Sequence, residues 1–196
     1  MKLASYIGTH AGIMGLGNIL IRFRIAGWRQ ALQLEAVPGQ RELRASHTEV
    51  VFMPGDGVDH LMPDGTCEPN EAGEYWCASS TGLEHIPIES KRRGGRRGGV
   101  RFKRIKVHTP KWHLTPLHTD PIYAANWAVD NQGKLYDWQL VFGFLVWVLP
   151  NKANRYMCNE AALEMMQFLD AHRFDPCSTQ AIAETLHRFR LAATTK

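Results

Sequence analysis

The chain has 196 residues, of which 44% are hydrophobic and 21% are charged, a balance typical of one globular domain with a substantial core. The formal net charge is +4, and the four cysteines are too few and too scattered for a disulfide framework. This composition excludes a largely disordered chain and a small disulfide-stapled protein, and it favours a reducing compartment.

The first elements are a glycine-rich start, a short strand and a helix. Residues 1–20 are expected to form a loop, and their interrupted apolar character makes a poor signal peptide, so we expect a cytoplasmic protein. A short strand is predicted over 19–25. Residues 28–37 have a helical composition that ends at Pro38-Gly39, a strong helix terminator.

Two strands separated by a long loop are predicted next. Residues 48–53 are rich in β-branched and aromatic side chains, and the turn residues of 54–57 end them. Residues 55–73 have the composition of a loop, and residues 74–80 that of the second strand.

A basic segment follows, with nine Lys and Arg side chains between positions 91 and 106. Glycines punctuate its first part, so we expect a mobile or sharply turned loop over about 90–99. Residues 100–107 alternate apolar and basic side chains, which predicts a strand with one face in water. A solvated loop is the simplest interpretation of these charges, and binding of an anionic polymer is the alternative.

The rest of the chain is predicted to be mainly helical. Three prolines argue against regular structure over 109–121. A buried helix is expected over 135–149, with a strand as the alternative, and its apolar run of ten residues is too short to span a bilayer. The clearest helix covers 154–172, and a last one runs from about 178 to 190. The expected fold is therefore α+β, a small antiparallel sheet packed against helices in a single domain over 1–196.

Cys158 is the first candidate for chemistry. It lies near the start of the helix predicted over 154–172, on the same apolar face as Ala162, Met165 and Met166. Unpaired amides and the positive end of the dipole at a helix N-terminus stabilise a thiolate. On position alone, however, a small buried core residue is the preferred interpretation of this cysteine.

His47 and Glu49 form a second candidate pair. They are two residues apart at the start of a predicted strand, so both side chains project from the same face. A carboxylate beside an imidazole can orient the ring and raise its basicity, as the activation of a thiol requires. The alternative is that Thr48, Val50 and Phe52 form the core face and that His47 and Glu49 lie in water. Alternation alone does not separate these two interpretations.

The order of these motifs resembles one known family. A serine and the histidine–glutamate pair at 46–49 open a strand, the dipeptide Tyr136-Asp137 follows, and Tyr156, Cys158 and Glu160 open a helix far downstream. This order resembles the circularly permuted branch of the NlpC-type papain-like cysteine peptidases and amidases, which includes YiiX-like and prophage-encoded members. Residues 19–23 and 28–37 are similar to the first strand and helix of that family, and Gly98-Gly99-Val100-Arg101-Phe102 is similar to a stretch of its prophage members.

The resemblance implies a permuted papain-like fold in which Cys158 is the nucleophile and His47 is its base. It implies a cysteine hydrolase without a cofactor that cleaves an amide of the peptide or peptidoglycan type through an acyl-enzyme. A lipid ester or amide is the alternative substrate on the same fold. Tyr156 and Ser79 are then expected to contact the substrate.

The third catalytic residue is less clear from the resemblance. Family members often carry a glutamate followed by alanine on the strand after the histidine strand, where this chain has Cys77-Ala78 or Ser79. Glu49 is therefore the preferred third residue, and Ser79 or His60 are the alternatives.

Two other classes of function compete with this interpretation. A nucleic-acid-binding protein would use residues 91–106, although Phe102 is the one aromatic residue in that run and a stacking platform needs several. A zinc protein would draw its ligands from one of two sets, Cys67, Cys77, His60 and His85, or His108, His113 and His118. Neither set has the ligand spacing of a zinc site. The sequence does not predict an oligomeric state.

Overall fold

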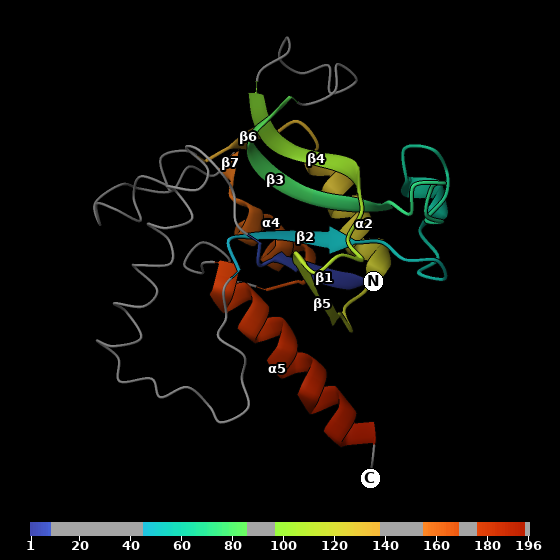
Figure 1. Ribbon diagram of the computed structural model, residues 1–196, viewed down its shortest axis with the longest axis vertical. Helices are drawn as coiled ribbons and strands as arrows, with labels where there is room; N and C mark the ends of the chain where they lie inside the picture. The colour runs from blue at the N-terminus through green and yellow to red at the C-terminus, as the bar shows by residue number, and fades with distance from the viewer. Residues whose placement is uncertain (9–44, 86–96, 138–154, 169–175, 195–196) are drawn as a thin grey trace, which may run out of the picture.

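The computed structural model describes residues 1–8, 45–85, 97–137, 155–168 and 176–194 (Figure 1). These residues form a five-stranded antiparallel sheet, a two-stranded parallel pair and three α-helices, which confirms the α+β class. None of these helices combines the length and apolar character needed to cross a bilayer. The strand predicted over 19–25, the helix over 28–37 and most of the segments 90–99 and 135–149 lie outside the described residues.

The main sheet contains five strands in the spatial order β4-β3-β2-β1-β5. Their bounds are β1 Lys2–Tyr6, β2 His47–Val51, β3 Tyr75–His85, β4 Arg97–Ile105 and β5 Trp112–Pro116. The strands predicted over 48–53, 74–80 and 100–107 correspond to β2, β3 and β4. Because β2 lies between β1 and β3, its residues are held in the middle of the sheet.

Two expectations about loops are wrong. Residues Lys2–Tyr6, expected in the first loop, form β1, which pairs with both β2 and β5. Residues Trp112–Pro116, expected to be irregular, form the edge strand β5. Proline is tolerated there because one side of an edge strand needs no ladder hydrogen bonds, and Pro116 stands at the strand's last position. Both strands depend on pairing between distant segments, which local composition does not reveal.

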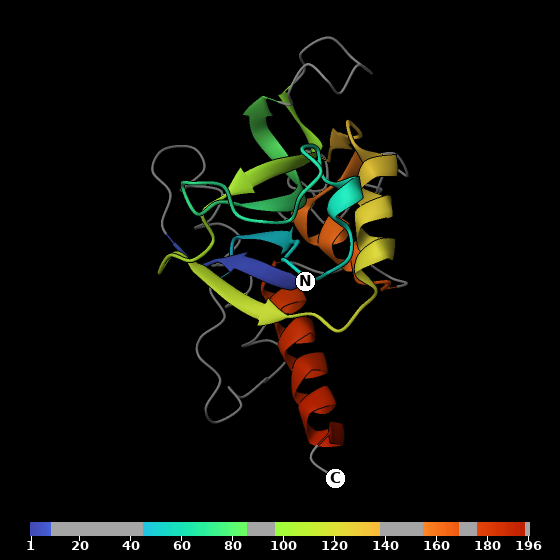
Figure 2. The same ribbon diagram turned by 90° about the vertical axis from the view of Figure 1, so that its right-hand side faces the viewer.

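The helices lie toward one side of the sheet. Figure 2 shows α2 (Pro121–Asn131) and α4 (Cys158–Met165) beside one face, and α5 (Pro176–Thr194) projecting beyond the sheet toward the C-terminus. The sequence analysis did not predict α2. It begins with a proline at its first position, and the Asp120 side chain caps it by accepting from the Ile122 amide at 2.9 Å.

The helix predicted over 154–172 begins later than expected. Arg155–Tyr156 form the short strand β7, which pairs in parallel with β6 (Leu135–Tyr136). The start of the segment 135–149 is therefore a strand and not a helix. Helix α4 begins at Cys158, because the Glu160 carboxylate accepts from the Met157 amide at 2.8 Å and completes a capping box.

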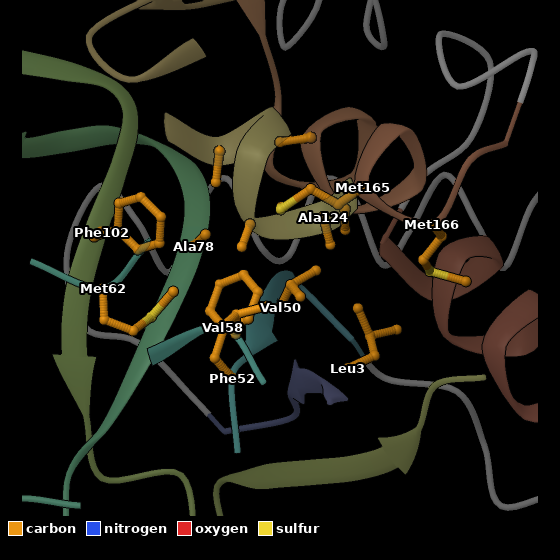
Figure 3. Packing of buried hydrophobic residues seen from close by; sticks show 14 of the residues in the cluster. Leu3, Val50, Phe52, Val58, Met62, Ala78, Phe102, Ala124, Met165 and Met166 are labelled. Atoms are coloured by element: carbon orange, nitrogen blue, oxygen red, sulfur yellow. The ribbon is translucent and has the colours of Figure 1, made fainter. Parts of the chain in front are cut away.

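The main core lies between the sheet and these helices (Figure 3). Leu3, Val50, Ala78 and Phe102 are paired across β1, β2, β3 and β4, so their side chains form one row on the face toward the helices. Alanines and methionines of α2, of α4 and of the residue that follows α4 pack against this row, namely Ala124, Ala125, Ala128, Ala161, Ala162, Met165 and Met166. Side chains alternate along a strand, so the neighbours of this row project from the opposite face of the sheet.

Candidate active site

Cys158 is the first residue of α4, and it is 3% exposed. The strand before it, β7, is tied to β3 because the Ser80 hydroxyl donates to the Tyr156 carbonyl oxygen at 2.6 Å. The helix itself packs on β2 and β3 through Ala161, Ala162 and Met165. These contacts place the helix N-terminus, with its positive dipole end, beside the beginning of β2.

His47 is the first residue of β2 and lies next to this thiol. Its Nε2 atom is 2.7 Å from Oε1 of Glu49. The ring also makes a side-chain hydrogen bond with Cys158. Because Nε2 faces Glu49, Nδ1 is the ring nitrogen that remains for this bond. The structure thus brings Cys158, His47 and Glu49 into one chain of contacts, with His47 in the middle. The His47 side chain is 24% exposed, so solvent reaches the Cys158–His47 pair from the side of the imidazole ring.

Glu49 is buried, with 1% of its side chain exposed. Arg101 on β4 binds both of its oxygens, Nη1 to Oε2 at 2.7 Å and Nη2 to Oε1 at 2.7 Å. Thr48, Val50 and Phe52 are buried, as the alternative interpretation expected, but its claim that Glu49 lies in water is wrong. Both faces of β2 are covered. A buried carboxylate with this geometry is a strong, fixed acceptor for the histidine ring.

The charged forms of Cys158, His47 and Glu49 stabilise one another. Burial alone would lower the pKa of His47, but the Cys158 thiolate and the Glu49 carboxylate raise it to about 10. Burial alone would raise the pKa of Cys158, but the charge and hydrogen bond of His47 and the Thr48 amide lower it below its ordinary value. Burial would also raise the pKa of Glu49, which Arg101 and His47 lower to about 2. These directions favour a thiolate–imidazolium pair beside an ionised carboxylate.

Thr48 completes the surroundings of the sulfur. Its backbone amide stabilises the thiolate. Its hydroxyl is buried and also helps to lower the pKa of Cys158, although it makes no ordinary hydrogen bond within the described residues. Both groups can therefore donate to a negative sulfur.

The structure places the three candidates for the third catalytic position in different surroundings. Glu49 is bonded to the His47 ring. Ser79 has no exposed surface, and its hydroxyl donates to the Thr48 carbonyl oxygen at 2.6 Å. His60 is an exposed residue of the short 3₁₀ helix Asp59–Leu61.

Tyr156 lies at the end of β7 with its ring packed edge-on against Trp127, at a centroid separation of 5.1 Å. The Lys134 ammonium lies 5.4 Å from the centroid of the same ring. Tyr156 thus belongs to the packing between β7 and α2. The contacts with substrate expected of Tyr156 and Ser79 stay predictions.

Two residues of the site lie in surroundings that the sequence analysis did not predict. Arg101 belongs to the alternating strand that was expected to have one wet face, and that expectation is wrong for Arg101, which is 3% exposed. Tyr136 is close enough to Cys158 that burial and the thiolate charge raise the pKa of its phenol well above the ordinary value. The Tyr136-Asp137 dipeptide was visible in the sequence as part of the resemblance. Arg101 was visible only as part of the stretch Gly98-Gly99-Val100-Arg101-Phe102, and that resemblance assigned it no role.

The remaining basic residues of β4 are a mixture. Arg104 donates to the Asp64 carboxylate at 2.6 Å and packs over the Trp76 ring, whereas Lys103 is exposed. Residues 91–96 lie outside the described part of the chain. Binding of an anionic polymer by the basic run therefore stays a prediction.

The histidines of one alternative zinc site are dispersed. His108 stacks edge-on against Tyr75 and His113 pairs with Glu184 at 3.0 Å, whereas His118 contacts His187 at 2.8 Å. Cys67 and Cys77, from the other set, belong to two different apolar clusters. Within the ranges that the structure describes, no three His, Cys, Asp or Glu residues are arranged to hold a metal ion.

Comparisons of this chain with known protein families, with curated proteins and with solved structures find no match. The resemblance to the permuted NlpC-type peptidases therefore stays a prediction. The interpretation of the site depends on its own geometry.

Proposed function

We propose that the chain is a cysteine hydrolase in which Cys158 is the nucleophile, His47 is its base and Glu49 orients the histidine. The observation that carries the proposal is the continuous set of contacts from the thiol at the start of α4, through the imidazole, to a buried carboxylate 2.7 Å from the ring. A structural cysteine in the core needs neither a histidine partner nor an ionised carboxylate behind that partner.

The arrangement supports acyl transfer through a thioester. The Cys158 sulfur attacks the carbonyl carbon of the substrate, and the carbonyl oxygen takes up the negative charge of the tetrahedral intermediate. Backbone amides at the start of α4 are the proposed donors to that oxyanion. The imidazolium of His47 then protonates the leaving amine as the C–N bond breaks.

The second half of the reaction regenerates the enzyme. A water molecule gives a proton to His47 and its oxygen attacks the thioester carbon. Collapse of this second intermediate breaks the C–S bond, releases the carboxylic acid and restores the thiolate–imidazolium pair. The proposed substrate is an amide of the peptide or peptidoglycan type, with a lipid ester or amide as the alternative on the same residues.

Selective alkylation of the native protein tests the nucleophile. Iodoacetamide at neutral pH, followed by peptide mapping, is expected to label Cys158 well before Cys67 and Cys77. Burial and nearby carboxylates raise the pKa of Cys67 to about 12, and burial and Glu49 raise that of Cys77 well above the ordinary value. These two thiols are therefore internal controls. Equal labelling of all cysteines, or protection of Cys158 until the protein is denatured, contradicts the proposal.

A further inference from the structure

Arg101 reaches its carboxylate across an intervening strand. Strand β3 lies between β4 and β2. Ser79 is paired with Arg101, and continuing the pairing of Val50 with Ala78 by one residue places Ser79 opposite Glu49 as well. Neighbouring strands are about 4.8 Å apart, so the Arg101 and Glu49 side chains together must span roughly 10 Å over the position of Ser79.

The small side chain at position 79 makes this reach possible. Ser79 is fully buried, and its hydroxyl is turned to the Thr48 carbonyl oxygen. Arg101 can therefore extend along the face of the sheet and place both terminal nitrogens on Glu49. The two-pronged contact holds the carboxylate in one plane, so that Oε1 is directed at Nε2 of His47.

We propose that Arg101 is a positioning residue of the Cys158–His47 pair, which fixes the Glu49 carboxylate and neutralises its charge so that the imidazolium remains available to the thiolate. This inference rests on the proposed function, because it assigns Arg101 a role in the same site.

The reason lies in the balance of buried charge. With Arg101 present, two positive groups (Arg101 and the His47 imidazolium) face two negative groups (Glu49 and the Cys158 thiolate), and the cluster is neutral. Without Arg101, the imidazolium already balances Glu49, and a thiolate would leave a net negative charge in a buried site. Burying an uncompensated charge is costly, so the thiol form of Cys158 would be favoured.

Other ionisable groups also face this cluster, and two of them, Cys77 and Tyr136, stay neutral near neutral pH. From β3, Cys77 faces Glu49, and burial and the Glu49 charge raise its pKa so that it stays a thiol. From β6, Tyr136 faces Cys158, and burial raises its pKa so that it stays a neutral phenol. Glu160 of α4 lies near Tyr136 and is engaged by the Met157 amide, and Asp137 follows β6.

The pH dependence of Cys158 alkylation by iodoacetamide tests the inference without a known substrate. Removing a positive charge raises the pKa of every nearby acid, so Arg101→Met should move the acid limb of the profile up by about one pH unit. Glu49→Gln removes a negative charge and should move the same limb down. The double variant E49Q/R101M should return the limb close to its wild-type position, because the two charge changes cancel.

Arg101→Lys separates charge from geometry. Lysine keeps the positive charge but lacks the planar fork of arginine, so the limb should stay near its wild-type position while the plateau rate falls. Arg104→Met is the matched control. It removes another paired arginine from β4, one bound to Asp64, and should leave the profile unchanged.

Each outcome decides between the alternatives. A folded R101M variant with a wild-type acid limb overturns the inference, because a merely structural role lowers the folded fraction without moving the limb. If R101M does not fold, E49Q and E49Q/R101M are compared instead. The limb of E49Q should then lie about one pH unit below that of the double variant, and equal limbs overturn the inference. Failure of the proposed function is distinguishable, since wild-type Cys158 would then show no preferential alkylation at all.

Discussion

Replacing His47 by alanine removes the group that lowers the pKa of Cys158. The ordinary pKa of a cysteine thiol is about 9.0, and the imidazolium holds the pKa of Cys158 below it against the effect of burial. Once the ring is gone, burial acts with little opposition, as it does at Cys67, where burial together with nearby carboxylates raises the pKa to about 12. The pKa of Cys158 in His47→Ala should therefore lie above 9.0.

The size of the effect follows from the thiolate fraction. At pH 7 a thiol of pKa 9 is ionised in about one molecule in a hundred, so the rate of alkylation should fall, by up to roughly 100-fold relative to a fully ionised thiol. A pKa near that of Cys67 would give a larger loss. The assay is the rate of carboxamidomethylation of the Cys158 peptide at pH 7, measured by mass spectrometry, with the thiolate absorbance near 240 nm as a second readout.

His113→Ala is the matched control for this experiment. His113 also pairs with a glutamate, Glu184, at 3.0 Å, but it lies on β5 and is 35% exposed. Its loss should leave Cys158 alkylation unchanged. A decrease of less than about threefold in folded His47→Ala would refute the reasoning, because a factor of that size corresponds to less than half a pKa unit.

Three further outcomes follow from other contacts. Glu49 has a folded pKa of about 2 against an ordinary value of 4.5, so its ionised form stabilises the fold above pH 4.5. This contribution is lost as the pH falls toward 2, and the melting temperature should drop over that range. Glu49→Gln should flatten the drop. Ser80→Ala removes the 2.6 Å hydrogen bond to the Tyr156 carbonyl and should lower the free energy of unfolding in urea, with a slower alkylation of Cys158; the loss should be about 1 kcal/mol, and unchanged values of both would contradict the anchoring of β7. Phe52→Ala empties a fully buried position of the core and should lower the free energy of unfolding; a loss of about 3–5 kcal/mol is expected, and a loss below about 1 kcal/mol would show that Phe52 packs loosely.

Local chemistry was sufficient to predict part of the fold. β-Branched and aromatic residues with turn residues beside them indicated β2 and β3, and the apolar face of Ala162, Met165 and Met166 indicated α4. The strands β1 and β5 were not predicted, because each is defined by hydrogen bonds to segments far away in the chain. Such pairing overrides local propensity.

The candidate site, like the fold, could be predicted only in part from the sequence. The motif order suggested that Cys158, His47 and Glu49 belong together, and the structure brings them into contact. Arg101 was missed because alternation shows which residues share a face but not whether that face is covered. In a sheet buried on both faces, an arginine bound to a carboxylate has the same sequence pattern as a solvated one.

The two halves of the proposed reactive pair come from distant parts of the chain, one on the second strand of the sheet and the other on a helix that follows the last strand. Until β2 and α4 have docked, Cys158 has neither its imidazole partner nor its place on a helix N-terminus, and it behaves as an ordinary thiol. Contacts of such long sequence separation form late and slowly during folding. Reactivity is therefore latent in the nascent chain, and the onset of rapid alkylation during refolding would time the arrival of the native topology.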